Sequence, residues 1–281
     1  MFSTIFMTTP ASLEDIEVQL LLEAIYRYYG YDFRNYAPSS LKRRVRHFLH
    51  SEGLPTVSAL QAKILHDRTC LDRLLLGLTV NTTSMFRDPS FYVAFREQVV
   101  PLLKTYPFIR IWHAGCSTGQ EVYSMAILLQ EEGIYHRCRV YATDTNEQVL
   151  QTARTGIFTL DKMQEYTQLY LKAGGKQSFS EYYTADYKNA IFRSSLKEHL
   201  VFAQHNLVTD GSFNEFNVIL CRNVLIYFNS TLQQQVHQLF YNSLCKFGIL
   251  GLGKQESIRF TPHEADYEEV AQGQKLYRRR N

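Results

Sequence analysis

The stretch Ile109-Arg-Ile-Trp-His-Ala-Gly-Cys-Ser-Thr-Gly-Gln-Glu121 decides the fold of this chain. Its apolar start predicts a buried strand, and two glycines separate that strand from a helical pattern that begins at Glu121. Glycine lets a backbone approach a ligand closely, and a helix N-terminus offers N–H groups without partners in the helix. The stretch matches neither G-x-G-x-x-G nor GxxxxGK[ST], so neither dinucleotide nor triphosphate binding is directly supported. A nucleoside ligand remains compatible with it.

Strand and helix patterns alternate around this stretch. We expect helices at residues 89–104, 121–132, 147–154 and 232–246, and strands at residues 109–113, 139–144, 216–221, 249–253 and 276–278. Such alternation is typical of a parallel α/β sheet that helices cover on both faces.

The first quarter of the chain carries helical patterns alone. We expect helices at residues 13–29 with Gly30 at the end, then after Pro38 with Ser39 or Ser40 as N-cap, and then at residues 57–66 and 69–78. The pattern therefore predicts a small all-helical domain at residues 10–78, followed by an α/β domain at residues 79–281.

The segment between Thr155 and Leu200 is too long for an ordinary connection. It has about 45 residues, whereas such connections usually have roughly 2 to 6. Its many Phe and Tyr residues favour small strands with one packed face. We interpret residues of about 157–200 as an inserted β-subdomain. This subdomain either forms a local core only or also offers a docking surface for a peptide.

Composition excludes several classes of protein. The 30 Lys and Arg against 27 Asp and Glu give a net charge of +3, too small to indicate nucleic-acid or membrane binding by bulk charge. The five cysteines form no CxxC pair and have no His nearby at ligand spacing, so a disulfide framework and a metal site are disfavoured. Without a secretion signal or an apolar run of roughly 18 residues, we expect a cytoplasmic protein without membrane insertion.

Polar residues follow several of the predicted strands. Asp144 ends a strand about 25 residues after Gly119, where Rossmann-type folds place a carboxylate that accepts ribose hydroxyls. Alone, such an acid is also a common N-cap or loop residue. The carboxyl ends of parallel strands meet at one edge of a sheet, so one crevice would collect the polar residues there. These are Gly115, Glu121, Asp144, Asn206 and Asn223.

Five motifs occur in order along the chain. They are Asn81-Thr-Thr-Ser-Met-Phe-Arg87, Gly115-Cys-Ser-Thr-Gly-Gln-Glu-Val-Tyr-Ser124, Ala142-Thr-Asp144, His205-Asn-Leu207 and Cys221-Arg-Asn-Val-Leu-Ile-Tyr-Phe228. Together they resemble the successive motifs of the CheR family of S-adenosylmethionine-dependent chemoreceptor methyltransferases. The segment 31–45 is similar to the family's first domain, so the resemblance covers most of the chain. Two departures are Met85, where an aromatic residue is common, and the segment 246–257, which lacks part of a Pro-Gly-Gly turn.

The resemblance implies a helical substrate-recognition domain and a Rossmann-like class I methyltransferase domain. It implies methyl transfer from S-adenosylmethionine to glutamate carboxylates of chemoreceptors. The residues that would line the cofactor site are Asn81, Thr83, Arg87, Gly115, Glu121, Asp144, Asn206, Leu207, Arg222 and Asn223. Arg87 and Tyr227 would lie beside the transferred methyl group as catalytic residues. A glutamate with a pKa near 4.3 is ionised at pH 7, so its attack needs no general base.

A basic stretch in the first domain suggests how a receptor would bind. No acidic residue occurs between Phe33 and Ser51, and a helical wheel places Leu41 and Val45 on the face opposite the cations. Such a run is either a solvated face or a surface that steers an acidic partner. With a glutamate-bearing helical substrate, we expect Arg43, Arg44 and Arg46 to contact the receptor's cytoplasmic helical bundle. In some family members the β-subdomain docks a receptor's C-terminal tether peptide; tether use here stays open, and a monomer suffices.

Two alternatives remain at this stage. The chain would act as a scaffold or sensor of a signalling array if it bound the nucleoside without transferring a methyl group. Nucleic acid ranks lower as a substrate, because Asn223-Val-Leu-Ile-Tyr227 is not the [DN]PP[YF] motif of amino-methylating DNA enzymes and no target-recognition domain is added.

Overall fold

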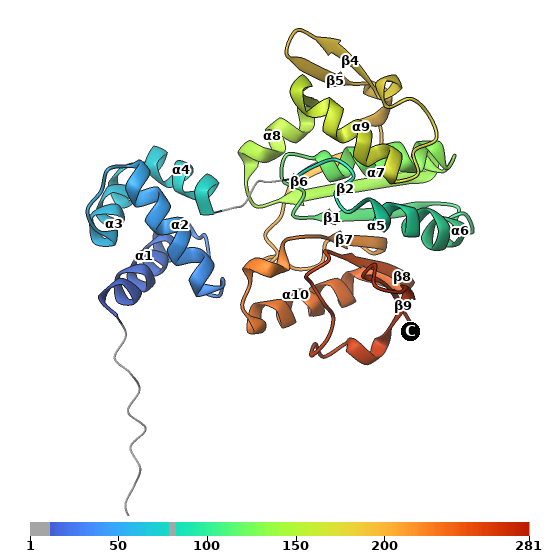
Figure 1. The fold of residues 1–281 in the computed structure, drawn as a ribbon. Coiled ribbons are helices and arrows are strands. Elements are labelled where there is room, and N and C mark those ends of the chain that lie inside the picture. Colours follow the sequence, from blue (N-terminus) through green and yellow to red (C-terminus); the bar gives the residue numbers. More distant parts are fainter. Residues whose placement is uncertain (1–11, 79–82, 281) are drawn as a thin grey trace, which may run out of the picture. The chain divides into compact units, whose positions relative to one another are not determined.

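The computed structural model describes residues 12–78 and 83–280 of the chain. The chain divides into two compact units, Met1–Val80 and Asn81–Asn281, and each is described by itself. Figure 1 shows the helices and strands of both units. Among the described residues, no helix is both long enough and apolar enough to cross a membrane.

The first unit is helical, as predicted. It contains α1 (Leu13–Tyr29), α2 (Pro38–Ser51), α3 (Val57–His66) and α4 (Arg68–Leu78). The hydroxyl of Ser12 accepts a hydrogen bond from the N–H of Asp15 and so caps α1, which Gly30 ends with a φ of 82°. Apolar side chains at helical spacing, such as Leu21 and Ile25, are fully buried between the helices.

The start of α2 differs from the prediction. Ser39 and Ser40 lie within the helix, and the N-cap is Ala37, whose side chain makes no capping hydrogen bond. Pro38 occupies the first helical position. Proline is favoured there because the N–H that it lacks would have no partner within the helix.

A seven-stranded sheet organises the second unit. Its strands are β1 (Ile109–Ala114), β2 (Cys138–Asp144), β6 (Leu200–Gln204), β7 (Phe216–Cys221), β8 (Leu244–Leu252), β9 (Tyr267–Ala271) and β10 (Leu276–Arg279). Their order is β6-β2-β1-β7-β8-β10-β9, with β10 antiparallel to both of its neighbours and the other pairs parallel. The order reverses between β1 and β7. In such sheets, ligands bind beyond the carboxyl ends of the strands at this reversal.

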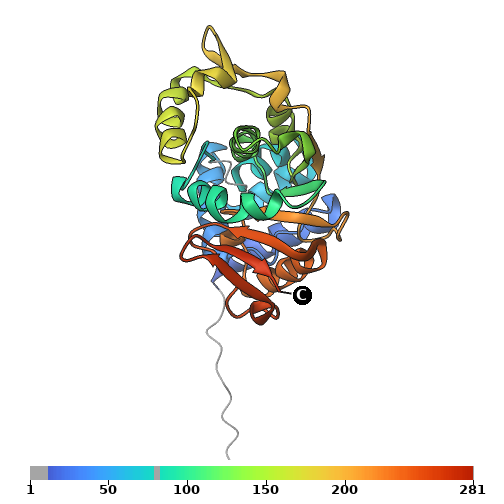
Figure 2. The ribbon, with the colours of Figure 1, turned by 90° about the vertical axis from the view of Figure 1, so that its right-hand side faces the viewer.

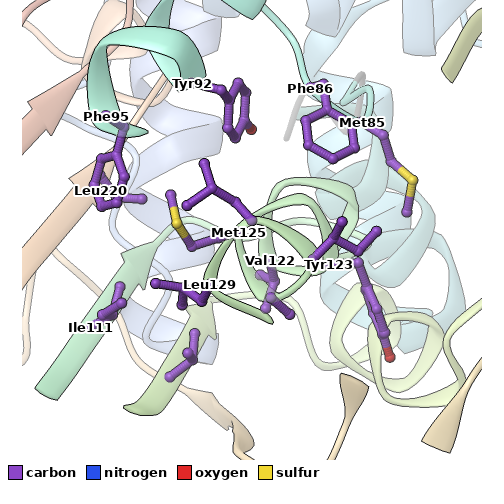
Figure 3. Packing of buried hydrophobic residues seen from close by; sticks show 14 of the residues in the cluster. Met85, Phe86, Tyr92, Phe95, Ile111, Val122, Tyr123, Met125, Leu129 and Leu220 are labelled. Atoms are coloured by element: carbon purple, nitrogen blue, oxygen red, sulfur yellow. The ribbon is translucent and has the colours of Figure 1, made fainter. Parts of the chain in front are cut away.

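Helices cover this sheet. They are α5 (Pro89–Ala94), α6 (Val100–Leu103), α7 (Gln120–Glu131), α8 (Glu147–Thr155) and α10 (Ser230–Ser243). In Figure 1, α7 and α10 lie on opposite sides of the sheet. Every residue of α7 from Val122 to Leu129 is buried, and Figure 3 shows Leu129 on the side of this helix that faces Ile111 of β1. A helix that is apolar on all sides belongs inside the protein, which explains the central place of α7.

Two predicted helices differ in detail, and one strand was not predicted. The helix expected at residues 89–104 is interrupted by a π-helical turn at Phe95–Val99, because Pro101 lacks an N–H and its ring would clash with the preceding turn of a regular helix. The helix expected at residues 232–246 ends at Ser243, and residues 244–246 begin β8. The edge strand β9 was not predicted.

The insert forms a small subsheet and a helix. Its strands β3 (Ile157–Thr159), β5 (Asn189–Phe192) and β4 (Tyr183–Asp186) pair antiparallel in the order β3-β5-β4. The helix α9 (Met163–Lys172) was not predicted. Figure 2 shows this part of the chain, coloured yellow, projecting from the rest of the second unit. The carboxylate of Glu131 on α7 holds it by accepting hydrogen bonds from the hydroxyls of Tyr170 and Tyr182.

Candidate functional site

The loop after β1 packs against the loop after β7. Gly115 has a φ of 81°, and a Cβ added there would lie 2.5 Å from Cγ2 of Val224. The position therefore requires glycine for both its backbone conformation and its close approach. The N–H groups of Gly115 and Cys116 both donate to the carbonyl of Thr143, at 2.8 and 2.9 Å, and so fix the loop to the end of β2.

Asp144 lies at the carboxyl end of β2, beside this loop. Its carboxylate accepts hydrogen bonds from the N–H of Ser117 at 2.9 Å and from the N–H of Asn146 at 3.1 Å. Burial raises the pKa of Asp144 despite these hydrogen bonds. The hydroxyl oxygen of Ser117 is buried and has no hydrogen-bond partner among the described residues. A carboxylate next to an unpartnered hydroxyl suits the donors and acceptors of a ribose diol, so this end of the site fits a nucleoside cofactor.

Asn206 and Leu207 follow β6, the strand next to β2. The N–H of His205 donates to the carbonyl of Asp144 at 3.1 Å, which joins the two strand ends. The side-chain carbonyl of Asn206 accepts a hydrogen bond from the N–H of Val208 at 2.9 Å, and Leu207 is buried. Both predicted residues therefore lie at the same edge of the sheet as Asp144.

The buried Arg222 and the half-buried Glu121 form an ion pair. Nη1 of Arg222 lies 2.9 Å from Oε2 of Glu121, and the Arg222 side chain is 1% exposed. Oε1 of Glu121 lies 3.0 Å from Nδ1 of His113. Burial by itself would raise the pKa of Glu121. The Arg222 guanidinium and His113 outweigh this effect and hold the pKa below its ordinary value. The Glu121 side chain is thus engaged in a network between β1, α7 and the end of β7.

The same guanidinium holds the segment before α5. Nη2 of Arg222 donates to Oδ2 of Asp88 at 2.8 Å and to the carbonyl of Arg87 at 3.0 Å. It also lies over the ring of Phe91, 4.2 Å from the centroid. Arg222 was predicted to line the cofactor site, but its guanidinium is committed to these protein contacts. The structure therefore brings Arg87 to the end of β7 through Arg222.

The loop after β7 carries Asn223 and leads to Tyr227. Asn223 has a φ of 62°, and the turn Leu225–Tyr227 follows it. The side-chain amide of Gln233 on α10 donates to the carbonyls of Leu225 at 3.0 Å and Phe228 at 3.1 Å. This amide fixes the turn against α10, and Tyr227 is half-buried at its end.

Glu256 is the residue that the sequence analysis missed. Its Oε1 accepts hydrogen bonds from the N–H groups of Val224 and Leu225, both at 2.8 Å. Its Oε2 accepts from the N–H of Asn223 at 3.0 Å and from the N–H of Gly253 at 2.6 Å. The residue is 4% exposed, and burial raises its pKa. One carboxylate therefore joins the loop after β8 to the loop after β7. No sequence motif around Glu256 predicts this role.

Two remaining positions of the first motif are only partly described. Thr83 is half-buried, whereas Asn81 lies outside the described residues. The N–H of Phe86 donates to the hydroxyl of Ser124 at 3.0 Å, which ties this motif to α7. Met85 is completely buried in the core, so the departure from an aromatic residue affects packing there.

The three cations predicted to bind substrate do not share one surface. Arg43 is exposed on α2, and the exposed Arg46 pairs with Glu14 of α1. Arg44, in contrast, is buried and donates a hydrogen bond to the carbonyl of Leu78. The prediction of a common face was wrong for Arg44, because this residue lies three positions after the buried Leu41 and so falls on the inner side of the helix.

Comparisons with known proteins identify a family and several relatives. A family model described as "CheR methyltransferase, SAM binding domain" matches residues 81–275, and one described as "CheR methyltransferase, all-alpha domain" matches residues 16–79. The chain is 50% identical to Cher3 of Pseudomonas putida, a provisionally named methyltransferase, over 94% of this chain and 97% of that one. It is 28% identical to a chemotaxis protein methyltransferase of Listeria innocua, over 91% and 95% of the two chains. It is 27% identical to one of Salmonella typhimurium, over 90% and 87%.

Proposed function

The chain belongs to the CheR methyltransferase family, and from this membership we propose that it methylates glutamate side chains of chemoreceptors, giving glutamate methyl esters. It is an S-adenosylmethionine-dependent methyltransferase of the CheR type. The names of the Listeria and Salmonella relatives support a chemotaxis substrate. A receptor's cytoplasmic helical bundle would be the partner, which implies a cytoplasmic location for this enzyme.

One observation carries the proposal: the segments that bear the motif residues are joined at one edge of the sheet. Ser117 bonds Asp144, Arg222 bonds the carbonyl of Arg87, and Glu256 bonds the loop that leads to Tyr227. Segments far apart in sequence are thereby held next to the reversal between β1 and β7, where open α/β sheets bind ligands.

The cofactor would lie across the ends of β1, β2 and β6. Asp144 and the Ser117 hydroxyl would bind its ribose, and the backbone near Gly115 would approach it closely. Asn206 and Leu207 would contact its base from the end of β6. When bound, S-adenosylmethionine supplies an electrophilic methyl group on a sulfonium sulfur.

Arg87 and Tyr227 would act on the acceptor. Arg87 would orient the glutamate carboxylate through charge-assisted hydrogen bonds, and the Tyr227 hydroxyl would donate one more. The acceptor oxygen forms the new bond to the methyl carbon, and the electron pair of the broken carbon–sulfur bond stays on sulfur. Because the acceptor is already ionised at pH 7, orientation is the main task; it supplies roughly 7–11 kcal/mol in well-aligned systems.

The remaining parts would serve substrate recognition. We infer that residues 10–78 form the recognition domain, with the exposed Arg43 and Arg46 steering the acidic receptor toward residues 79–281. The insert at about 157–200, with its subsheet β3-β5-β4, would take a receptor tether peptide if one is used.

Two measurements test the function. Calorimetry with S-adenosylmethionine and S-adenosylhomocysteine should give micromolar binding that is lost in Asp144→Ala. A radiolabelled methyl group should then appear, in base-labile form, on a purified cytoplasmic fragment of a methyl-accepting chemotaxis protein. Cofactor binding without any labelled receptor would contradict the methylation proposal and favour a scaffold instead.

A further inference from the structure

A hollow of about 520 Å³ lies beyond the carboxyl end of β8, and none of its lining residues is one of those assigned to the cofactor. Its lining includes Leu225, Ile226, Gln255, Arg259, Phe260 and Lys275. Gly115, Asp144, Asn206 and Leu207, which would contact the cofactor, lie at the ends of β1, β2 and β6, whereas β8 lies on the far side of β7. At a strand spacing of about 4.8 Å, β8 is roughly 10 Å from β1. The hollow shares Leu225 and Ile226 with the turn that ends at Tyr227.

Hydrogen bonds fix the walls of this hollow. Gln233 holds one wall through the carbonyl of Leu225, and Glu256 holds the N–H of the same residue. The carbonyl of Lys275 accepts a hydrogen bond from the N–H of Leu252 at 3.0 Å, which places Lys275 at the end of β8. The N–H of Phe260 donates to the Glu264 carboxylate at 2.8 Å. The backbone around the hollow is therefore fixed by hydrogen bonds within the fold, so the hollow is preformed for a ligand.

The lining carries two cations, Arg259 and Lys275, and one carboxylate, Glu256. Arg259 is exposed and Lys275 is half-buried, and neither forms an ion pair within residues 12–78 and 83–280. Glu256 also lines the hollow, but its carboxylate is engaged by four backbone N–H groups. A carboxylate-bearing ligand would therefore meet two cations there without competition from an acid of the lining.

Phe260 supplies an apolar contact at the rim. Its side chain is 91% exposed, and its backbone has a φ of 63°, a conformation that is costly for a residue other than glycine. The bond to Glu264 stabilises this conformation. The combination keeps a phenyl ring in solvent beside two cations, as expected for a surface that meets an amphipathic partner.

We propose that this hollow docks an acidic segment of the methyl-accepting protein next to the glutamate that is methylated. Arg259 and Lys275 pair with carboxylates of that segment, and Phe260 covers one of its apolar side chains. The inference rests on the proposed function for the identity of the partner. Its binding chemistry is independent of methyl transfer and is tested separately.

The test measures the binding of a fluorescein-labelled helical peptide of about 20 residues, rich in glutamate, by fluorescence anisotropy. In the full chain, Arg259→Glu with Lys275→Glu should weaken binding about tenfold, since two attractions become repulsions. Phe260→Ala should weaken it less. The matched control is Arg139→Glu with Lys246→Glu, which changes two exposed cations near the amino ends of β2 and β8 and should leave the affinity unchanged. A peptide with Gln in place of Glu should not bind.

The outcomes separate the two proposals. The Arg259/Lys275 variant should raise KM for a receptor fragment while keeping kcat and S-adenosylhomocysteine affinity. Native-like peptide affinity and KM in that variant overturn the docking proposal, as does an equal loss in the Arg139/Lys246 control. If the native chain methylates no receptor but binds the peptide through Arg259 and Lys275, the hollow is confirmed and the glutamate-methylation proposal fails. Arg259→Gln with Lys275→Gln serves as the milder variant should the reversal not fold.

Discussion

The carboxylate of Glu256 accepts a hydrogen bond from the backbone N–H of Asn223 at 3.0 Å, across 33 residues of sequence. Together with its bonds to Val224 and Leu225, it fixes the backbone that leads to Tyr227. Asn223 has a positive φ, so its conformation depends on such support. The position of Tyr227 is therefore controlled by an acid from a different loop.

Glu256→Gln should lower both stability and turnover. An amide has one oxygen to accept hydrogen bonds, and its NH2 group would face N–H donors, so we expect a loss of about 2–4 kcal/mol in the free energy of unfolding. Denaturant unfolding measures this loss, with the exposed Glu165→Gln as the control. If the loop positions Tyr227, kcat should fall while S-adenosylhomocysteine binding changes little, and Glu256→Asp should restore part of kcat. Wild-type kcat in a folded Glu256→Gln variant would contradict the positioning role.

The ion pair between the buried Arg222 and the half-buried Glu121 predicts how stability changes on mutation and with pH. Arg222→Met leaves Glu121 and Asp88 without their cation and should cost about 3–5 kcal/mol. Glu121 has a folded pKa below its ordinary value of 4.5, so its contribution is present above pH 4.5 and is lost as pH falls through the lowered pKa. Urea unfolding at several pH values should show a smaller acid loss of stability in Glu121→Gln than in the native chain. Identical acid profiles would contradict this assignment.

The sequence predicted the parts of the fold that have strong local patterns. The helix α1 ends at Gly30 as expected, and β7 has its predicted bounds. The strand β9 was missed because it is an edge strand whose Glu268 and Glu269 are exposed, so it lacks an apolar alternation. The end of α10 was placed too late because helical spacing of apolar residues continues into β8.

Residues of the site could be predicted only where they belong to a recognisable sequence motif. Asp144 follows a strand and was found by that rule, whereas the role of Glu256 depends on N–H groups brought near it by tertiary structure. Arg44 shows the opposite error, since charge alone suggested a solvent-facing residue. Its carbonyl partner, Leu78, lies in another helix and cannot be inferred from helical periodicity.

Tyr227→Phe and Arg87→Ala test the catalytic assignment. Loss of one donor to the acceptor carboxylate should reduce kcat roughly 10- to 100-fold. Tyr227→Phe should leave S-adenosylhomocysteine affinity unchanged, because the hydroxyl would act on the acceptor. Arg87→Ala is expected to lower kcat and also to lower the affinity for the cofactor, because Arg87 would line the cofactor site as well. Calorimetry and single-turnover methyl transfer separate the two effects. Near-normal turnover in both folded variants would remove these residues from the mechanism.

The helix α2 offers a contrast between an exposed and a buried arginine. Arg43→Glu with Arg46→Glu should slow receptor methylation, and the effect should shrink as salt rises, because exposed charges act mainly on encounter and are screened. Arg44→Ala should instead lower the stability of the first unit by about 1–3 kcal/mol, since it leaves the carbonyl of Leu78 without this donor. Initial rates of receptor methylation at two ionic strengths measure the first effect, with Arg27→Glu on α1 as the charge control. Thermal unfolding measures the second effect. Native stability in Arg44→Ala would contradict the structural role of this buried arginine. An effect of the charge reversal that does not depend on salt would contradict the steering role of Arg43 and Arg46.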